Sequence, residues 1–75
     1  MNYVDAKLRV AFGKRIRARR RAMDMSQEKM AELAGLHRTY VSTIERGGQS
    51  VSLDNAAKIA KVLNVSLSEL FERLG

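Results

Sequence analysis

The 75-residue sequence has no cysteine, no proline and no tryptophan, and it has a single histidine. Without cysteine the chain can form neither a disulfide nor a thiolate site, and a lone histidine cannot build a zinc site. No apolar stretch approaches the roughly 20 residues that span a bilayer, and residues 1–10 lack the apolar segment of a signal peptide. These absences predict no cofactor, no metal ion and no membrane partner, and they favour a cytoplasmic protein.

Positive charge and apolar residues are what the chain does have. Lysine and arginine number 14 against 8 acidic residues, which gives a formal net charge of +6, and 45% of the residues are hydrophobic. This length predicts one domain, residues 1–75, with one modest core. The apolar content and the lack of proline favour a compact helical domain over a disordered tail. The charge favours a polyanion as partner, although charge alone does not separate DNA from RNA or an acidic membrane.

Apolar residues recur at helical spacing throughout, so the sequence predicts an all-α protein with five helices and no strand. Breaks at 23–25, 35–36, 47–51 and 64–65 separate helices that are expected at about 5–22, 27–34, 37–47, 53–63 and 67–74. Ser26 and Ser52 are good N-cap residues, and Ser66 with Glu69 forms a capping box. The expected ends of the second and fourth helices are Gly35 and Asn64, which can take a left-handed conformation.

The same spacing predicts which residues face the core. The expected inward residues are Leu8, Ala11, Phe12, Ile16, Met30, Leu33, Ala34, Val41 and Ile44, with Tyr40 at the edge. The fourth helix presents the apolar residues Leu53, Ala56, Ala57, Ile59, Ala60 and Leu63. The remaining faces of the first helix carry Lys14, Arg15, Arg17, Arg19 and Arg21. Most of these are expected to form a solvated basic surface, and the alternative for some of them is an approach to phosphates.

Residues 26–47, SQEKMAELAGLHRTYVSTIERG, are the most informative part of the chain. They predict two short helices joined by a tight turn at Gly35. The second of these helices exposes hydroxyls, a basic side chain and an aromatic ring, which suits insertion into the DNA major groove. The sequence therefore predicts a helix-turn-helix at residues 26–46 and a DNA-binding regulator.

The chain resembles the XRE-type, or lambda-repressor-like, helix-turn-helix family. The resemblance rests on SQEKMAELAGL, VSTIERG and LDNAAKIAKVLNVSLSELF, in this order, and covers about residues 8–72. LHRTYVSTIERG followed by SVSLDNAAKIAKVL and SELF is similar in particular to the controller proteins of restriction-modification systems. That similarity implies a small dimeric activator and repressor that binds its own promoter region. The alternatives are a phage- or plasmid-type repressor and an antitoxin-like protein-interaction module.

A recognition helix reads bases from its N-terminal, solvent-facing half. In this half the base-contacting candidates are Arg38, Thr39, Ser42 and Thr43, and Arg38 could contact guanine bidentately. The phosphate-contacting candidates are Gln27, Tyr40, Arg46, Gln49, Ser50 and Ser52. Gln27, Gln49, Ser50 and Ser52 lie at or near helix N-termini, which suit a phosphate, and the family places a phosphate-binding glutamine at the position of Gln27.

The resemblance implies further roles. It places the hydroxyl of Tyr40 on a phosphate, whereas the alternative is an ordinary half-buried aromatic residue. Arg46 is expected to be a phosphate or surface residue. Arg20 and Glu45 are expected to form an ion pair that ties the first helix to the end of the third.

A single domain of this size reads few base pairs, so we expect a homodimer on a pseudo-palindromic double-stranded operator. A second adjacent site, bound by a second dimer, would favour a controller protein. The expected dimerisation region is about 64–74, with Leu67, Phe71 and Leu74 facing the partner while Val65 and Leu70 complete the core. The alternative is that all five belong to the core.

Glu28 and Glu32 lie four residues apart and point outward together on the second expected helix. They are candidates for contact with the sigma subunit of RNA polymerase, and the alternative is solubility and pairing with Lys29. No catalytic residue is expected, because the chain has no nucleophile–base–acid set and no glycine-rich phosphate loop. RNA would fit the charge, but aromatic residues make up only 5% of the chain and provide no stacking platform.

Overall fold

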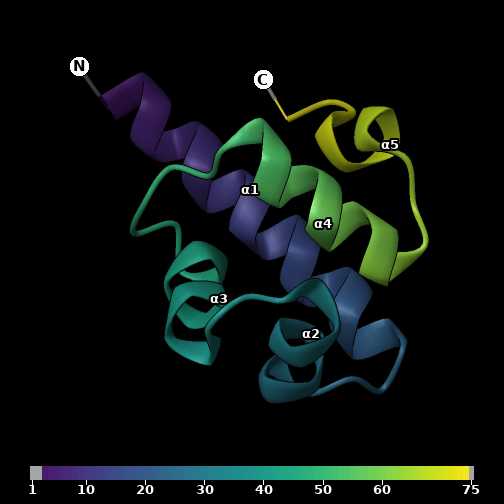
Figure 1. Ribbon diagram of the computed structural model, residues 1–75. Helices are drawn as coiled ribbons and strands as arrows, with labels where there is room; N and C mark the ends of the chain where they lie inside the picture. Colours follow the sequence, from purple (N-terminus) through teal and green to yellow (C-terminus); the bar gives the residue numbers. More distant parts are fainter. Residues whose placement is uncertain (1–2, 75) are drawn as a thin grey trace.

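Five α-helices form the computed structural model, which describes the backbone of residues 3–74 and the side chains of residues 6–74. The helices are α1 (Tyr3–Ala22), α2 (Gln27–Ala34), α3 (Arg38–Glu45), α4 (Leu53–Leu63) and α5 (Leu67–Phe71). No strand occurs within residues 3–74, and the expected all-α fold with five helices is confirmed. α2 and α3 pack on each other at the bottom of the view in Figure 1, and α5 lies at the top right.

The helix caps follow the sequence signals. Ser26, Ser52 and Ser66 each accept a hydrogen bond from the backbone N–H three residues further along the chain. The carboxylate of Glu69 completes the capping box by accepting a bond from the N–H of Ser66 at 2.9 Å. Gly35 and Asn64 take φ angles of 70° and 58° and follow the last residues of α2 and α4. These local bonds explain why the predicted bounds of α2 and α4 agree with the structure.

The bounds of the other three helices differ from the expectation, and α1 differs only in beginning at Tyr3. α3 is shorter at both ends, and His37 is its N-cap residue without a side-chain capping bond. α5 ends at Phe71 and not at residue 74. Its end is set by Glu72, which is extended with φ −61° and ψ 125°, and by Arg73, which has a φ of 58°.

The hydrophobic core lies where all five helices meet and contains Phe12, Ile16, Met30, Ala31, Val41, Ile44, Ala56, Ile59, Ala60, Leu63 and Leu70. Two leucines that the pattern places inside are exposed: Leu8 by 44% and Leu33 by 54%. α2 turns Met30, Ala31 and Ala34 inward, so Leu33 lies beside this face at the edge of the α2–α4 contact. Leu8 lies on the rim of a surface cavity.

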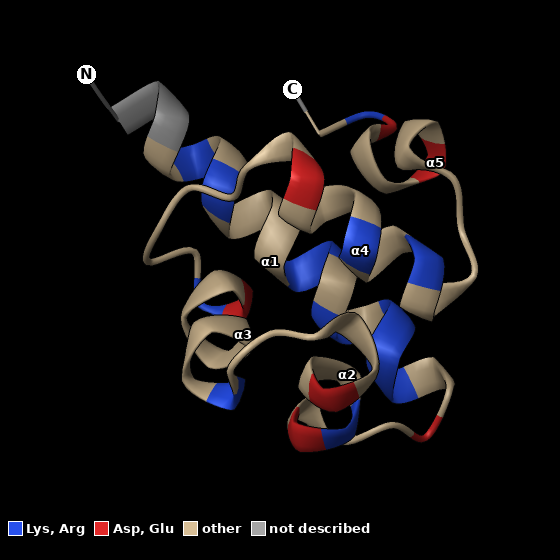
Figure 2. Ribbon diagram, in the orientation of Figure 1, with Lys and Arg blue, Asp and Glu red and all other residues tan. Residues whose placement is uncertain are grey.

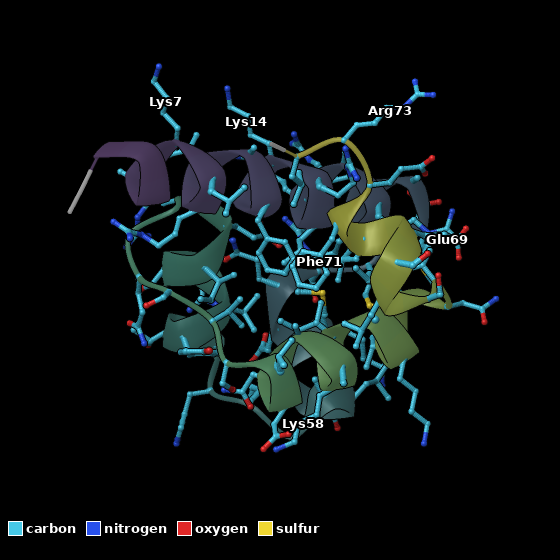
Figure 3. The ribbon with its side chains drawn as sticks, turned by 90° about the horizontal axis from the view of Figure 1, so that it is seen from above. Lys7, Lys14, Lys58, Glu69, Phe71 and Arg73 are labelled. Atoms are coloured by element: carbon cyan, nitrogen blue, oxygen red, sulfur yellow. The ribbon has the colours of Figure 1, made fainter. Side chains whose placement is uncertain are left out.

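Arginines of α1 bind the ends of other helices. Nη1 of Arg15 donates to the carbonyls of Glu69 and Leu70 at 3.2 and 3.3 Å, and Nε of Arg19 donates to the carbonyl of Leu63 at 3.1 Å. Carbonyls in the last turn of a helix lack an intrahelical donor and carry partial negative charge. The expectation of a solvated basic surface does not hold for the half-buried Arg15, whereas Arg19 is exposed and also binds a carbonyl. The expectation agrees with the structure for the exposed residues Lys14, Arg17 and Arg21. Figure 3 shows Lys14 pointing away from the body of the protein.

The expected ion pair between Arg20 and Glu45 is present, and both residues are buried. Nε of Arg20 lies 2.6 Å from Oε2 of the carboxylate and Nη2 lies 2.9 Å from Oε1. Nη1 donates to the carbonyl of Met25 at 2.7 Å. The hydrogen bonds to Glu45 raise the pKa of Arg20 above its usual value. One guanidinium thus joins α1, the turn before α2 and the last residue of α3.

α1 passes very close to the end of α3 at Gly13, a contact that the sequence analysis did not anticipate. A Cβ at this position would lie 2.4 Å from the carbonyl oxygen of Ile44 and 2.5 Å from that of Glu45. Such distances leave no room for any side chain. A glycine inside a helix costs about 1 kcal/mol relative to alanine, so an interior glycine is itself a signal of close packing.

Gly13→Ala should destabilise the fold by about 1–3 kcal/mol, because the added methyl group would force α1 away from α3. The effect opposes helix propensity, which favours alanine by about 1 kcal/mol. Chemical denaturation gives the free energy of unfolding. Ala18→Gly, at an exposed position of α1, is the matched control and should cost only the propensity term. A Gly13→Ala variant as stable as the parent would contradict the proposed constraint.

Glu45→Ala should lower the free energy of unfolding by about 3–5 kcal/mol, because it leaves the buried guanidinium of Arg20 without its partner. The thermal melting midpoint, followed by circular dichroism, measures the loss. Glu32→Ala is the control: Glu32 pairs with Lys29 at 3.4 Å on the surface, and an exposed pair contributes about 1 kcal/mol or less. Equal melting midpoints for the two variants would show that burial of the pair is of no consequence.

Candidate nucleic-acid interface

One face of α3 carries polar side chains, while Val41 and Ile44 on its other face belong to the core. The four base-contacting candidates lie together on the outer face because the spacing 38, 39, 42, 43 keeps them on one side of a helix. Arg38 and Thr39 are exposed, and the other two candidates are half-exposed. The structure therefore brings together the side chains that the sequence singles out for base contact.

Two hydroxyls on this face already have partners within the protein. Oγ1 of Thr43 donates to the carbonyl of Thr39 at 2.9 Å, and Oγ of Ser42 accepts from Nη1 of Arg46 at 2.8 Å. A hydroxyl has one hydrogen and two lone pairs. Thr43 is therefore left as an acceptor towards a ligand, and Ser42 keeps its hydrogen as a donor. The guanidinium of Arg46 lies along the same face.

The N-terminal end of α2 lies beside the ion pair. Gln27, the first residue of α2, is half-buried, and its Nε2 donates to Oε1 of Glu45 at 3.0 Å. The first N–H groups of a helix have no intrahelical acceptor, and they carry the positive end of the helix dipole. This end of α2 can therefore offer both backbone and side-chain donors to an anion.

Tyr40 combines features of both interpretations of this residue. Its ring is half-buried and packs against the core. Its hydroxyl oxygen accepts a hydrogen bond from Nδ2 of Asn55 at 3.0 Å. The hydroxyl hydrogen is not used in that bond and can be donated to another group.

The connection between α3 and α4 carries the remaining phosphate candidates, and Gln49, Ser50 and Ser52 are all exposed. The connection starts at Gly47, which has a φ of 75° and packs so closely on α1 that a Cβ would lie 2.7 Å from Cα of Val10. Nε of Arg9 also reaches the carbonyl of Gly47 at 3.4 Å. α1 therefore fixes the start of this connection as well as the end of α3.

Charge is distributed unevenly around these elements. Figure 2 shows basic residues along α1 and acidic residues on α2. Glu28 and Glu32 are exposed on α2, and Glu32 pairs with Lys29 as one of the two interpretations expects. Contact with the polymerase sigma subunit stays a prediction.

Within residues 3–74, no helix combines the length and apolar character that crossing a membrane requires.

A surface cavity of about 280 Å³ lies between α1, the connection before α4, and the C-terminal segment. Its apolar lining consists of Leu8, Phe12, Val51, Leu53, Phe71 and Leu74, and polar side chains of Arg9, Gln49, Ser50 and Ser52 complete it. Leu53 and Phe71 are exposed by 71% and 39%. Three of the most exposed large apolar residues, these two and Leu8, thus surround one cavity. The helical pattern did not predict that Leu8 and Leu53 line a cavity. It places both on the apolar faces of helices but does not show whether other residues cover them.

The three residues expected at a dimer interface differ in their environments. Leu67 and Leu74 are half-buried and pack against the monomer core. Phe71 points from α5 towards α1 in Figure 3, and its ring stacks on Phe12 with centroids 5.2 Å apart and an angle of 15° between the planes. Of the three, only Phe71 presents a large exposed surface.

Comparisons with known proteins agree with this geometry. The profile described as helix-turn-helix matches residues 16–70. Control protein C.BamHI from Bacillus amyloliquefaciens is 48% identical over 66 residues, which cover 87% of this chain and 82% of that protein. Control protein C.SmaI from Serratia marcescens is 42% identical over 60 residues, which cover 80% and 71% of the two chains.

A solved structure gives the same result. The restriction-modification controller protein C.AhdI from Aeromonas hydrophila superimposes with a TM-score of 0.82 and 48% sequence identity, over 84% of this chain and 96% of that one. The helix-turn-helix profile matches most of the chain, and the matched regions cover 71% to 96% of these three proteins. The protein therefore belongs to the XRE-type helix-turn-helix family and is similar to the control proteins of restriction-modification systems.

Proposed function

We propose that this protein is a sequence-specific DNA-binding transcriptional regulator that controls a restriction-modification system from its own promoter region. The observation that carries the proposal is the outer face of α3, where four polar side chains lie together on a helix whose end is fixed by a buried ion pair. Such a face suits the major groove. The similarity to the control proteins C.BamHI and C.SmaI supports the specific role.

In the proposed complex, α3 lies in the major groove and its flanking elements bind the DNA backbone. Arg38 has no partner among the described side chains, so its five N–H donors are available for guanine. Gln27 and the connection with Gln49, Ser50 and Ser52 would contact phosphates on either side. These contacts fix the position of α3 but carry no sequence information themselves.

Arg38→Ala should weaken binding to the specific site by about 1–3 kcal/mol, because it removes a bidentate base contact. Gel-shift titration and footprinting, at fixed salt, use DNA from immediately upstream of the protein's own reading frame, with scrambled DNA as competitor. Arg17→Ala, an exposed arginine of α1, is the matched control for loss of one charge and should change affinity for both DNAs equally. Equal losses of specificity in the two variants would refute the role of Arg38, and equal binding of both DNAs by the parent would refute the proposed operator.

The same footprint tests the larger assembly. A controller protein with two dimers would protect two adjacent pseudo-symmetric sites, whereas a simple repressor would protect one.

Activation needs a surface for RNA polymerase, and the exposed Glu28 is the proposed contact to its sigma subunit. Polymerase added to the footprint should then extend protection over the promoter, and Glu28→Lys should remove that extension without changing the protein's own footprint.

The proposed regulator acts as a homodimer that joins through the surface cavity. A twofold interface brings the same patch of each subunit together, so a protruding residue beside a matching hollow suits it. Leu53 protrudes beside the hollow formed by Leu8, Phe71 and Val51, and in the dimer each Leu53 would fill the cavity of the partner. Burial of exposed leucine and phenylalanine supplies the driving force.

Leu53→Glu should give a folded monomer, because the side chain is largely exposed in the single subunit and a buried carboxylate would oppose association. Analytical ultracentrifugation gives the oligomeric state, and circular dichroism verifies folding. Leu33→Glu is the matched control: Leu33 is also exposed, by 54%, but lies at the α2–α4 edge, so this variant should remain dimeric. A dimeric Leu53→Glu variant would contradict the interface, and a monomeric parent would contradict the dimer itself.

A further inference from the structure

A continuous set of hydrogen bonds links the buried ion pair to the surface at the start of α2. We infer that Glu45 is a positioning residue for DNA binding, which holds the side-chain amide of Gln27 so that it donates to a DNA phosphate. This inference rests on the proposed function, and it adds to it a role for a residue that would not touch DNA.

The carboxylate of Glu45 is held in a single orientation. Oε2 accepts from Nε of Arg20 at 2.6 Å, while Oε1 accepts from Nη2 of Arg20 at 2.9 Å and from Nε2 of Gln27 at 3.0 Å. Its side chain is only 2% exposed. A bidentate bond between two planar groups fixes their relative geometry. The position of Oε1 therefore does not vary independently of α1, and Gln27 binds to a fixed acceptor.

The chemistry of a carboxylate then determines which end of the amide faces it. An ionised carboxylate only accepts hydrogen bonds, so the nitrogen of the Gln27 amide must face Glu45, and a flip that brought its oxygen there would place two acceptors together. The amide nitrogen has two hydrogens, and Glu45 takes one. Gln27 is half-exposed, and its Nε2 makes no other hydrogen bond among the described residues, so the second hydrogen is left for an acceptor outside the protein.

This free hydrogen lies at the first residue of α2, where the backbone N–H groups also have no intrahelical acceptor. Arg20 further donates to the carbonyl of Met25 at 2.7 Å, which fixes the turn directly before the cap residue Ser26. Side chain and backbone donors at this point are thus set by the same guanidinium and carboxylate. An amide that is already oriented loses less rotamer freedom when a phosphate binds.

A double-mutant cycle on affinity for the specific DNA tests the inference. Gln27→Ala should weaken binding about tenfold, the loss expected for one hydrogen bond to a charged group. Glu45→Gln keeps the shape of the side chain but has one acceptor oxygen with two lone pairs, which cannot accept all three hydrogen bonds that Arg20 and Gln27 donate to the carboxylate. It should weaken binding by a similar factor in the parent and by much less in the Gln27→Ala background.

The matched control is Glu32→Gln, which makes the same change in net charge at an exposed site of α2. It should leave affinity unchanged or slightly raised, because added positive charge favours DNA. Weaker binding by Glu45→Gln would then run against the effect of charge. Affinities are compared at a temperature at which circular dichroism shows every variant folded.

A second measurement needs no variant. The chain contains two glutamines, Gln27 and Gln49, and Gln49 is exposed in the connection before α4. In the free protein, NMR relaxation of the side-chain amides should show Gln27 rigid and Gln49 mobile on the nanosecond timescale. Equal mobility of the two amides would overturn the inference even where the Glu45→Gln variant does not fold.

The outcomes separate this inference from the proposed function. Additive losses in the cycle, or no loss for Gln27→Ala, would overturn the positioning role while specific binding by the parent still supports a DNA-binding regulator. Absence of specific binding by the parent would overturn both. A non-additive cycle together with a rigid Gln27 amide would support both.

Discussion

The whole arrangement depends on how closely α1 crosses the end of α3. At Gly13 the backbone of α1 lies against the last carbonyls of α3 with no space for a side chain. This approach brings Arg20, two turns further along α1, within reach of Glu45, and brings Val10 onto Gly47. The end of α3, the connection that follows it and the turn before α2 are therefore all held in place by contacts with the single long helix α1. The proposed contact of α3 with base edges requires a rigid frame of this kind, because the side chains must be held in fixed positions.

Several arginines of this chain bind other parts of the fold, so the net charge of +6 does not serve only to attract a polyanion. Side chains of Arg9, Arg15, Arg19 and Arg20 donate to carbonyls or to a carboxylate of other elements. The charges of Arg15 and Arg19 offset the partial negative charge at the C-termini of α5 and α4. Arg20 neutralises the carboxylate of Glu45, so these charges stabilise the fold locally. The positive field still attracts a polyanion. The residues that would recognise DNA, however, are few and mostly neutral, and they lie on α2, α3 and the connection to α4.

Sequence reasoning was accurate for the helix caps, where the determining interactions are local. Ser26, Ser52 and Ser66 set helix starts through bonds that span three residues, and Gly35 and Asn64 end helices through their own backbone conformation. It failed at several points that depend on a distant segment, although the resemblance did give the pair of Arg20 with Glu45. The pattern could not show that α2 turns Ala31 and not Leu33 towards the core, or that Arg15 and Arg19 find carbonyls more than 40 residues away. Gly13 was visible as an interior glycine, but only the crossing of α1 and α3 gives its reason.

The proposed dimer interface and the proposed phosphate contacts share the connection before α4. In the connection before α4, Gln49, Ser50 and Ser52 are the candidates for phosphate contact, yet they line the same cavity as Val51 and Leu53. In the proposed dimer, the partner's leucine fills that cavity and thereby restrains the backbone that carries the phosphate contacts. Dimer formation and DNA binding would then each favour the other by the same free energy, as linkage requires. A regulator built this way binds its operator more steeply with concentration than two independent domains would, because assembly orders the segment that holds the DNA.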